Sequence, residues 1–253
     1  MKHILAALLA IACILTLCAC GASETQSTNS KNSVRTDESK TSFSEGVGSN
    51  SLPVQKTQAK DLELTDYGFC AGTSYDDIIY MDFCGMVYNP NESLAAMFRE
   101  VLATVSNPDG TILSTDSQMG MEVLPLDTVT ITGIIAVPTS QITEETTIQF
   151  QVKCSNFSSA DLEQKPKTSD FEVKNISEQS GSQCFITGTV TNLTDNMVDM
   201  VNLSLLLRKD GKIVFIENEF VDDLQPGAPT AFQFRSFSPW PDHDAVEVTA
   251  QAW

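Results

Sequence analysis

Histidine is the scarcest of the residues that carry enzyme chemistry in this 253-residue chain, which contains only His3 and His243. Basic residues are also few, with 15 Lys and Arg against 33 Asp and Glu, for a formal net charge of -18. A surface that binds nucleic acid needs Lys and Arg to neutralise phosphates, so this charge argues against DNA and RNA as partners. The same charge disfavours direct binding to anionic lipid headgroups.

Sequence motifs for catalysis and metal binding are missing as well. No Gly-x-Ser-x-Gly nucleophile elbow and no phosphate-binding glycine loop occurs. His243 lies between Asp242 and Asp244, but one His with two neighbouring carboxylates does not complete a zinc site, so we expect a solvated loop there. We therefore predict that the protein is not an enzyme and that it has no catalytic residues, no metal site and no cofactor.

The N-terminus has the pattern of a secretory signal. A charged start at Lys2 is followed by an apolar run from Ile4 to Leu17 and then by small residues. The run is shorter than the roughly 20 residues that span a bilayer, so a permanent transmembrane helix is not expected.

The end of this run, Leu17-Cys18-Ala19-Cys20, resembles the bacterial lipobox. The resemblance implies that residues 1–19 are a lipoprotein signal peptide and that Cys20 becomes the acylated N-terminus, carrying palmitate-type chains. Two acyl chains hold a protein stably on a membrane, whereas one holds it only marginally. The resemblance thus implies a chain anchored at the extracytoplasmic face of the cell membrane. An ordinary secretory signal cleaved nearby is the alternative.

Residues 20–59 comprise the lipidated Cys and a segment dominated by Ser, Thr, Asn, Gln and Gly without helical or strand periodicity. Such a composition predicts a disordered tether. Its acidic residues (Glu24, Asp37, Glu38, Glu45) are matched by its basic ones (Lys31, Arg35, Lys40, Lys56), so the negative charge belongs to residues 60–253.

The remainder of the chain shows an internal repeat. Gly85-Met86-Val87-Tyr88-Asn89 is echoed by Gly188-Thr189-Val190-Thr191-Asn192, and further matches follow in the same order. These are Asp109-Gly110 with Asp210-Gly211, and Leu124-Pro125 with Gln225-Pro226. The repeat predicts two domains, residues 60–157 and 158–253, joined near Lys165-Pro166-Lys167.

Each repeat has the periodicity of β-strands. In the second, Val201, Leu203, Leu205 and Leu207 alternate with Asn202, Ser204, Leu206 and Arg208, which is typical of half-buried strands. Asp109-Gly110 and Asp210-Gly211 predict hairpin turns, and Pro226-Gly227 predicts a further turn. Asn89 and Asn192 are expected to close a turn or to bind local backbone. Residues 93–105 also fit an amphipathic helix, but we expect a strand from Val101 to Val105. The predicted fold is all-β, two tandem Ig-like antiparallel β-sandwiches.

Residues 171–237 resemble the FxLYD-type domains of bacterial envelope lipoproteins, through Gly188, Val190, Asn192, Asp210, Gly211, Pro226, Gly227 and Phe232. Residues 62–135 carry a weaker copy, with Leu126 in the place of the turn glycine. The resemblance implies non-enzymatic extracytoplasmic modules and brings no catalytic residues.

Four cysteines lie beyond Cys20, namely Cys70, Cys84, Cys154 and Cys184. Outside the cytoplasm an even number permits disulfides, with three possible pairings, and free thiols remain equally open. The strand alternation predicts that Cys154 points inward and that Cys84 points outward.

The function expected from these patterns is that of a lipid-anchored, extracytoplasmic, non-enzymatic binding or structural module of the bacterial cell envelope. Its partner would be an envelope protein or a cell-wall component, bound through a sheet face or an edge strand. One alternative is a calcium-stabilised adhesive module, and the other is an enzyme of unrecognised type.

Overall fold

The structure is a computed structural model that describes residues 59–120, 122–143, 145–159 and 165–253. The predicted signal peptide (residues 1–19), the lipobox residues Leu17, Cys18 and Ala19, the lipidation site Cys20 and almost all of the predicted tether lie outside these residues. No helix in the described part of the chain is long and apolar enough to cross a membrane.

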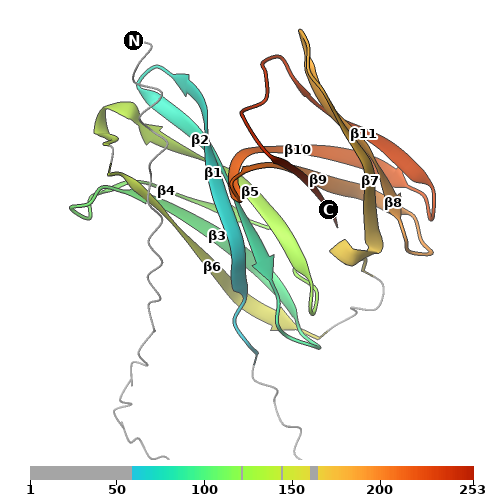
Figure 1. The fold of residues 1–253 in the computed structure, drawn as a ribbon. Coiled ribbons are helices and arrows are strands. Elements are labelled where there is room, and N and C mark those ends of the chain that lie inside the picture. Colours follow the sequence, from blue (N-terminus) through green and yellow to red (C-terminus); the bar gives the residue numbers. More distant parts are fainter. Residues whose placement is uncertain (1–58, 121, 144, 160–164) are drawn as a thin grey trace, which may run out of the picture. The chain divides into compact units, whose positions relative to one another are not determined.

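The prediction of an all-β fold is confirmed (Figure 1). The described residues form four three-stranded antiparallel sheets, and their helical segments include the single 3-10 turns Thr139–Gln141 and Thr168–Asp170. The first six strands are β1 (Glu63–Tyr75), β2 (Ile78–Tyr88), β3 (Ala95–Ser106), β4 (Ile112–Met119), β5 (Thr128–Pro138) and β6 (Thr147–Ser158). The second six are β7 (Phe171–Gln179), β8 (Cys184–Asn192), β9 (Val198–Lys209), β10 (Lys212–Leu224), β11 (Pro229–Ser236) and β12 (Ala245–Ala252).

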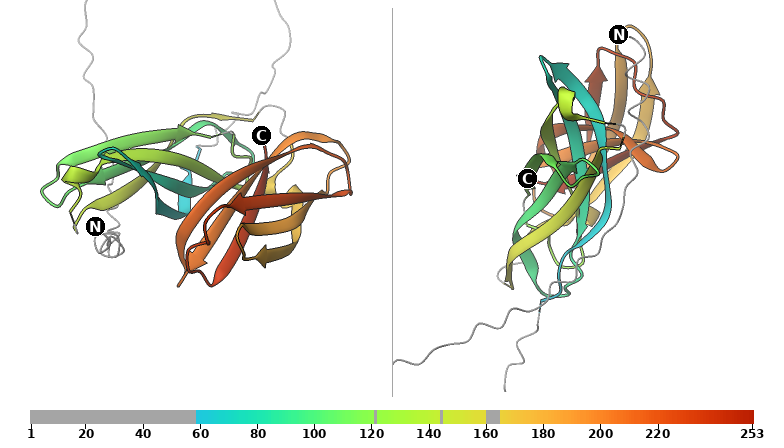
Figure 2. Two further views of the ribbon diagram at one scale, coloured as in Figure 1. Left: turned by 90° about the horizontal axis from the view of Figure 1, so that it is seen from above. Right: turned by 90° about the vertical axis from the view of Figure 1, so that its left-hand side faces the viewer.

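Each set of six strands forms one β-sandwich of two sheets, seen from two further directions in Figure 2. In the first sandwich (β1–β6), sheet β1-β2-β5 faces sheet β4-β3-β6. In the second sandwich (β7–β12), sheet β11-β8-β7 faces sheet β10-β9-β12. The strand order is the same in both sandwiches when their strands are counted from the first, which is the arrangement that a duplicated sequence predicts.

Period-two alternation places one face of each sheet in a core. In β8 every second residue from Cys184 to Asn192 is buried, and Ile186 and Val190 pack against Leu205 of β9 and Phe234 of β11. The first sandwich has its own core, which includes Phe83, Val101, Ile135 and Val137. The strand predicted from Val101 to Val105 is confirmed and extends back to Ala95, so the helical pattern there is overruled by pairing of β3 with β4 and β6.

The predicted turns have the backbone that their residues permit. Gly110 and Gly211 adopt positive φ, +86° and +77°, in the β3–β4 and β9–β10 hairpins. Gly227 has φ +66° after Pro226, and Leu126 has φ +57° after Pro125. Leu126 is thus held in a left-handed backbone conformation that glycine adopts at a much lower cost in free energy.

Candidate functional site

The outer face of sheet β1-β2-β5 is the surface on which the two sandwiches meet. Ile79, Met81 and Phe83 of β2 pack in or against the first core, so the residues between them, Tyr80 and Asp82 among them, point away from it. Ile78, Cys84 and Met86 share that outer face by the same alternation. Both sandwiches belong to one compact unit. One half of the outer face is covered by the second sandwich, and the other half is open.

The covered half is apolar. Cys70 of β1 and Cys84 of β2 pack with Leu206 of β9 and with Ile213 and Ile216 of β10. The approach is close: a Cβ added to Gly68 would lie 2.5 Å from Cβ of Ile213, so only glycine fits there. The expectation for Cys84 is corrected in one respect, because its side chain leaves its own core but is fully buried beneath the second sandwich.

The same junction corrects the sequence interpretation of β9. The alternation predicted a half-buried strand, yet every residue from Val201 to Leu207 is buried. The reason is that one face of β9 packs in the second core while Leu206, on the opposite face, packs against Cys70 and Cys84. The sequence signal of this contact was Leu206, an apolar residue at one of the outward positions of β9.

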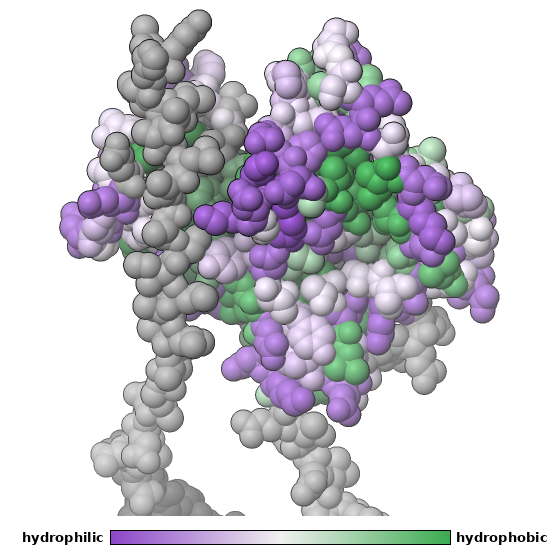
Figure 3. All heavy atoms as spheres, viewed as in Figure 1, coloured by the Kyte–Doolittle hydropathy of each residue, from purple (hydrophilic) through white to green (hydrophobic). Residues whose placement is uncertain are grey.

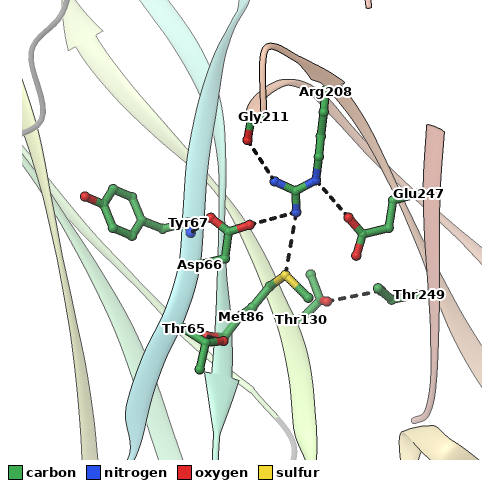
Figure 4. Close-up of polar contacts among 9 residues, drawn as sticks. All are labelled: Thr65, Asp66, Tyr67, Met86, Thr130, Arg208, Gly211, Glu247 and Thr249. Carbon is green, nitrogen blue, oxygen red and sulfur yellow. Dashed lines mark hydrogen bonds and ion pairs between the residues drawn. The ribbon is translucent and has the colours of Figure 1, made fainter. Parts of the chain in front are cut away.

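Arg208 closes the rim of the junction (Figure 4). Its Nη2 lies 2.7 Å from Oδ2 of Asp66 on β1, and its Nε donates to Oε2 of Glu247 on β12 at 2.8 Å. Burial lowers the pKa of the guanidinium, but hydrogen bonds and charge from Glu247 and Asp66 outweigh this and raise the pKa overall. Arg208 is therefore a cation shared between a carboxylate of each sandwich.

Polar contacts from β5 complete the junction. The backbone N–H of Thr130 donates to Oε1 of Gln251 at 2.9 Å, and the hydroxyls of Thr130 and Thr249 lie 3.1 Å apart. Further along β5, Nδ2 of Asn218 donates to Oγ1 of Thr132 at 2.7 Å. These outward threonines hold the covered half of the face in a fixed register.

Two carboxyls lie beside the apolar part of the junction, Asp82 on β2 and Glu217 on β10. Burial raises the pKa of Asp82. Burial also raises the pKa of Glu217, with further contributions from the charges of Glu219 and Asp82. Oε2 of Glu217 is buried and has no hydrogen-bond partner among the described residues. The junction thus contains like charges with little solvent to screen them.

The open half of the outer face exposes large apolar side chains, which we call the open face: Tyr75, Ile78, Tyr80 and Ile134. Tyr75 pairs with Ile78 in the register, and Ile134 pairs with Asp82, so all four lie on one side of the sheet. Tyr75 is 70% exposed and Ile134 is 55% exposed, whereas Ile78 and Tyr80 are just over one-third exposed. Clustered apolar exposure of this kind marks interaction surfaces.

The second sandwich has apolar surface as well. On the face shown in Figure 3, apolar side chains gather over β10 and hydrophilic ones surround them. Val214 and Phe215 of β10 are partly buried and pack against the second core.

A pocket with a cavity volume of about 320 Å³ lies at the opposite side of the junction. Met197, Trp253 and Asp199 line it together with Asp127 and Gln251. The Asp127 carboxylate already accepts hydrogen bonds from the backbone N–H and the hydroxyl of Thr168 and from N–H of Thr128. Gln251 is bonded to Thr130, so these polar groups fix the walls of the pocket.

The two asparagines singled out by the sequence have matching bonds in the two sandwiches. Asn89 is fully buried, and its Nδ2 donates to the carbonyl oxygens of Leu94 and Val123 at 2.7 and 2.9 Å. Asn192 is equally buried, and its Nδ2 donates to the carbonyl oxygens of Asn196 and Leu224 at 2.7 and 3.1 Å. Both side chains bind backbone that would otherwise be buried unpaired.

The predicted turn residues stay at the loops and are not brought together into a site. Oδ1 of Asp109 accepts from N–H of Thr111, and hydrogen bonds from Thr111 lower the pKa of this exposed carboxyl. The N–H of Asp210 donates to Oδ2 of Asp244. The loop at His243 is solvated at Asp242 and Asp244, which are exposed, but the imidazole is mostly buried, with Nε2 3.1 Å from Oε2 of Glu178. Folding brings β7 beside this loop, which the sequence pattern does not reveal.

All four described cysteines are free thiols. Cys70, Cys84 and Cys184 are buried, and burial raises the pKa of both Cys70 and Cys84 to about 12. Cys154 is partly buried against the first core, and its Sγ donates to carbonyl oxygens of Met97 and Asn156. Within the described residues, no group of three or more His, Cys, Asp or Glu side chains is placed to hold a metal ion.

No protein-family model and no curated protein matches the chain. Among solved structures, it is similar to a Bacteroides uniformis β-glucuronidase bound covalently to cyclophellitol-6-carboxylate aziridine, with 13% identity and a TM-score of 0.27, over 68% of this chain and 24% of that one. A Parabacteroides merdae β-glucuronidase with glycerol in its active site has 13% identity and a TM-score of 0.21, over 71% and 28%. The chain thus spans about a quarter of the length of each enzyme.

These similar structures contradict the prediction that the protein is not an enzyme, and that prediction is withdrawn. It rested on the absence of sequence motifs, and such an absence does not exclude catalysis by residues that are brought together only in the folded structure. TM-scores this low carry no argument for a particular activity or for the role of any residue here.

Proposed function

We propose that the protein is a lipid-anchored module at the extracytoplasmic face of a bacterial cell membrane and that it binds an envelope protein through the open face. The anchor rests on the lipobox-like Leu17-Cys18-Ala19-Cys20 and on the preceding apolar run. The polar, charge-balanced residues 21–59 would hold the folded part away from the membrane surface.

The observation that carries the binding role is the contrast between the two halves of one sheet face. The covered half buries Cys84, with Met86 partly buried beside it, against β9 and β10, while Tyr75, Ile78, Tyr80 and Ile134 continue the same face in solvent. The Arg208 and Thr132 contacts keep the second sandwich on the covered half. A rigid, partly apolar sheet face needs little reorganisation to bind a partner.

The anchor is tested by metabolic labelling with a palmitate analogue. Labelling of the full chain and its loss in Cys20→Ala are expected, with Cys18→Ala retaining the label. Label that persists in Cys20→Ala would contradict the lipidation site.

The binding role is tested by chemical crosslinking of the tagged chain on living cells, followed by mass spectrometry. The control is a protein carrying only residues 1–59. An envelope protein recovered with the full chain, and lost in Tyr80→Ser/Ile134→Ser, supports the proposal. Ile176→Ser is the matched control because Ile176 is 40% exposed on β7 of the second sandwich. Recovery of cell-wall glycan alone, or equal recovery with the anchor control, would overturn it.

A further inference from the structure

The sheet that bears the open face contains acidic residues and no basic ones. Residues 63–88 and 128–138, which include all of β1, β2 and β5, contain five Asp and Glu, namely Glu63, Asp66, Asp76, Asp77 and Asp82, and no Lys or Arg. Asp66 is paired with Arg208 at the junction. The other carboxylates have no basic residue within their own sheet.

Two of these carboxylates stand directly beside the open face. Asp76 and Asp77 form the turn between Tyr75 and Ile78, and Asp76 adopts φ +51°. The backbone carbonyl of Asp77 accepts from N–H and Oγ1 of Thr139, which fixes the turn against the end of β5. Within the described part of the chain, neither side-chain carboxylate makes a hydrogen bond or an ion pair. Both are exposed and available to a ligand.

The negative net charge of the chain disfavours anionic ligands at the open face. A second copy would bring another net charge of -18 against the same acidic turn, and an anionic membrane would be repelled in the same way. A cationic surface would instead gain by complementarity with Asp76 and Asp77. The apolar centre requires that the cation be carried by a ligand that also has apolar groups.

We infer that the open face binds a basic segment of a partner polypeptide, whose Lys or Arg side chains meet Asp76 and Asp77 while its apolar side chains pack on Ile78, Tyr80 and Ile134. This inference rests on the proposed function and names the chemistry of the partner. A segment with basic residues at one end and apolar residues along the rest matches an apolar strip with an acidic end. The rings of Tyr75 and Tyr80 provide π faces for the same cations.

The test uses the full chain immobilised on a biosensor and two synthetic peptides, one with Lys residues at one end of a Val-containing stretch and the other with Glu in place of each Lys. The Lys peptide is expected to bind at low salt and to lose at least about tenfold in affinity at high ionic strength, because exposed charge pairs are screened. The Glu peptide is expected not to bind. Equal binding of the two peptides, or binding of the Lys peptide that is insensitive to salt, overturns the inference.

Variants in which carboxylates are replaced by neutral amides show which carboxylates bind the Lys peptide. Asp76→Asn/Asp77→Asn is expected to weaken binding of the Lys peptide at least about threefold, and Asn tolerates the positive φ of position 76. The matched control is Asp222→Asn/Asp223→Asn, which makes the same charge change at the far end of β10, where Asp222 pairs with Met200 and Asp223 also has positive φ. Equal weakening in both variants means that net charge alone drives binding, and this overturns the inference. Two further outcomes overturn the inference, each only if it is lost in Tyr80→Ser/Ile134→Ser: retention of the Cys20→Ala chain by phosphatidylglycerol vesicles, and self-association in sedimentation.

The inference and the proposed function fail in different ways. If a partner crosslinks to the open face in cells but its contacting segment has no Lys or Arg, the inference is wrong and the proposed function stands. If no protein crosslinks to the open face, the proposed function itself is wrong.

Discussion

Arg208 on β9 lies 2.7 Å from Asp66 on β1, so a residue of the second sandwich forms an ion pair with a residue of the first. The same guanidinium bonds Glu247 on β12 at 2.8 Å. Its side chain is only 16% exposed, which places the shared charge where solvent screens it weakly. This contact and the apolar cluster around Cys84 hold the two sandwiches in one arrangement.

The Arg208→Met variant is expected to lose about 1 to 3 kcal/mol of unfolding free energy, since two charge-assisted hydrogen bonds disappear and two carboxylates lose their partner. Urea denaturation measures the loss. The neighbouring Lys209→Met is the control, because Lys209 pairs with Asp242 at a site where Asp242 is 87% exposed. Its effect should stay within about 0.5 kcal/mol. Similar losses in the two variants would contradict the bridging role of Arg208.

Replacement of Leu126 by Gly is expected to stabilise the protein. Leu126 has φ +57° and is about half exposed, whereas the corresponding turn in the second sandwich has Gly227 with φ +66°. Relief of the left-handed backbone strain at position 126 should raise the unfolding free energy by about 1 kcal/mol. Part of this gain is lost because glycine gives up more conformational entropy on folding than leucine does. The reciprocal Gly227→Leu should lose a similar amount of stability, since no atom of the described residues lies within 4 Å of its Cβ position and only the backbone would be strained. Thermal denaturation of both variants provides the measurement, and a destabilised Leu126→Gly would refute the strain.

Glu217→Gln is expected to stabilise the protein at neutral pH and to have no such effect in acid. Burial raises the pKa of Glu217 above its unfolded value, with help from Glu219 and Asp82. Between the unfolded and folded pKa values the native state binds more protons, so this carboxyl makes the native state less stable as pH rises through that window. Below it the carboxyl is protonated in both states. Unfolding free energies across pH test this, with exposed Glu63→Gln as control; a gain that is the same at every pH would contradict the assignment.

The buried thiols are expected to be unreactive in the native protein. Burial raises the pKa of Cys70 and Cys84 to about 12, so almost no thiolate forms at neutral pH. Alkylation followed by mass spectrometry should modify Cys154 first, because Cys70, Cys84 and Cys184 are buried and Cys154 is only partly so. All four should react in denaturant without a reductant. If any of these four cysteines stays unmodified in denaturant, the expectation of free thiols is wrong.

Arg99→Met is expected to leave stability unchanged or to raise it by up to about 4 kcal/mol. Arg99 is fully buried, and its Nε, Nη1 and Nη2 have no hydrogen-bond partner in the part of the chain that the structure describes. Burial lowers its pKa to about 9. Methionine has similar length and no charge to desolvate. Val101→Ala on the same strand must lose stability because it leaves a cavity in the first core. If Arg99→Met loses as much as Val101→Ala, the guanidinium has a stabilising role that its contacts do not show.

The all-β fold class could be predicted because the alternation of apolar and polar residues with period two indicates β-strands. Leu203, Leu205 and Leu207 recur with period two and all lie in the second core. Gly110 and Gly211 mark the hairpins because only glycine adopts their φ without strain. The division into residues 60–157 and 158–253, the FxLYD resemblance and the lipid anchor stay predictions.

The junction was not predicted because it depends on contacts between residues far apart in the sequence. Cys84 and Leu206 were each assigned correctly to the outer side of a strand, but alternation cannot tell an outer face covered by another sheet from one in solvent. Asp66 and Arg208 are separated by most of the chain, and nothing local pairs them. Tyr80 is exposed and Cys84 is buried on the same face of β2, because the second sandwich covers the sheet at Cys84 and not at Tyr80. Local sequence does not contain this information.

The most direct test of the account is photo-crosslinking from position 80 of the full chain on living cells, with a photoreactive phenylalanine in place of Tyr80. The matched site is Ile176, which is exposed on β7. The account predicts that one envelope protein crosslinks from position 80 and not from position 176, and that its attached peptide contains Lys or Arg. No crosslinked protein, or the same proteins from both positions, would contradict it.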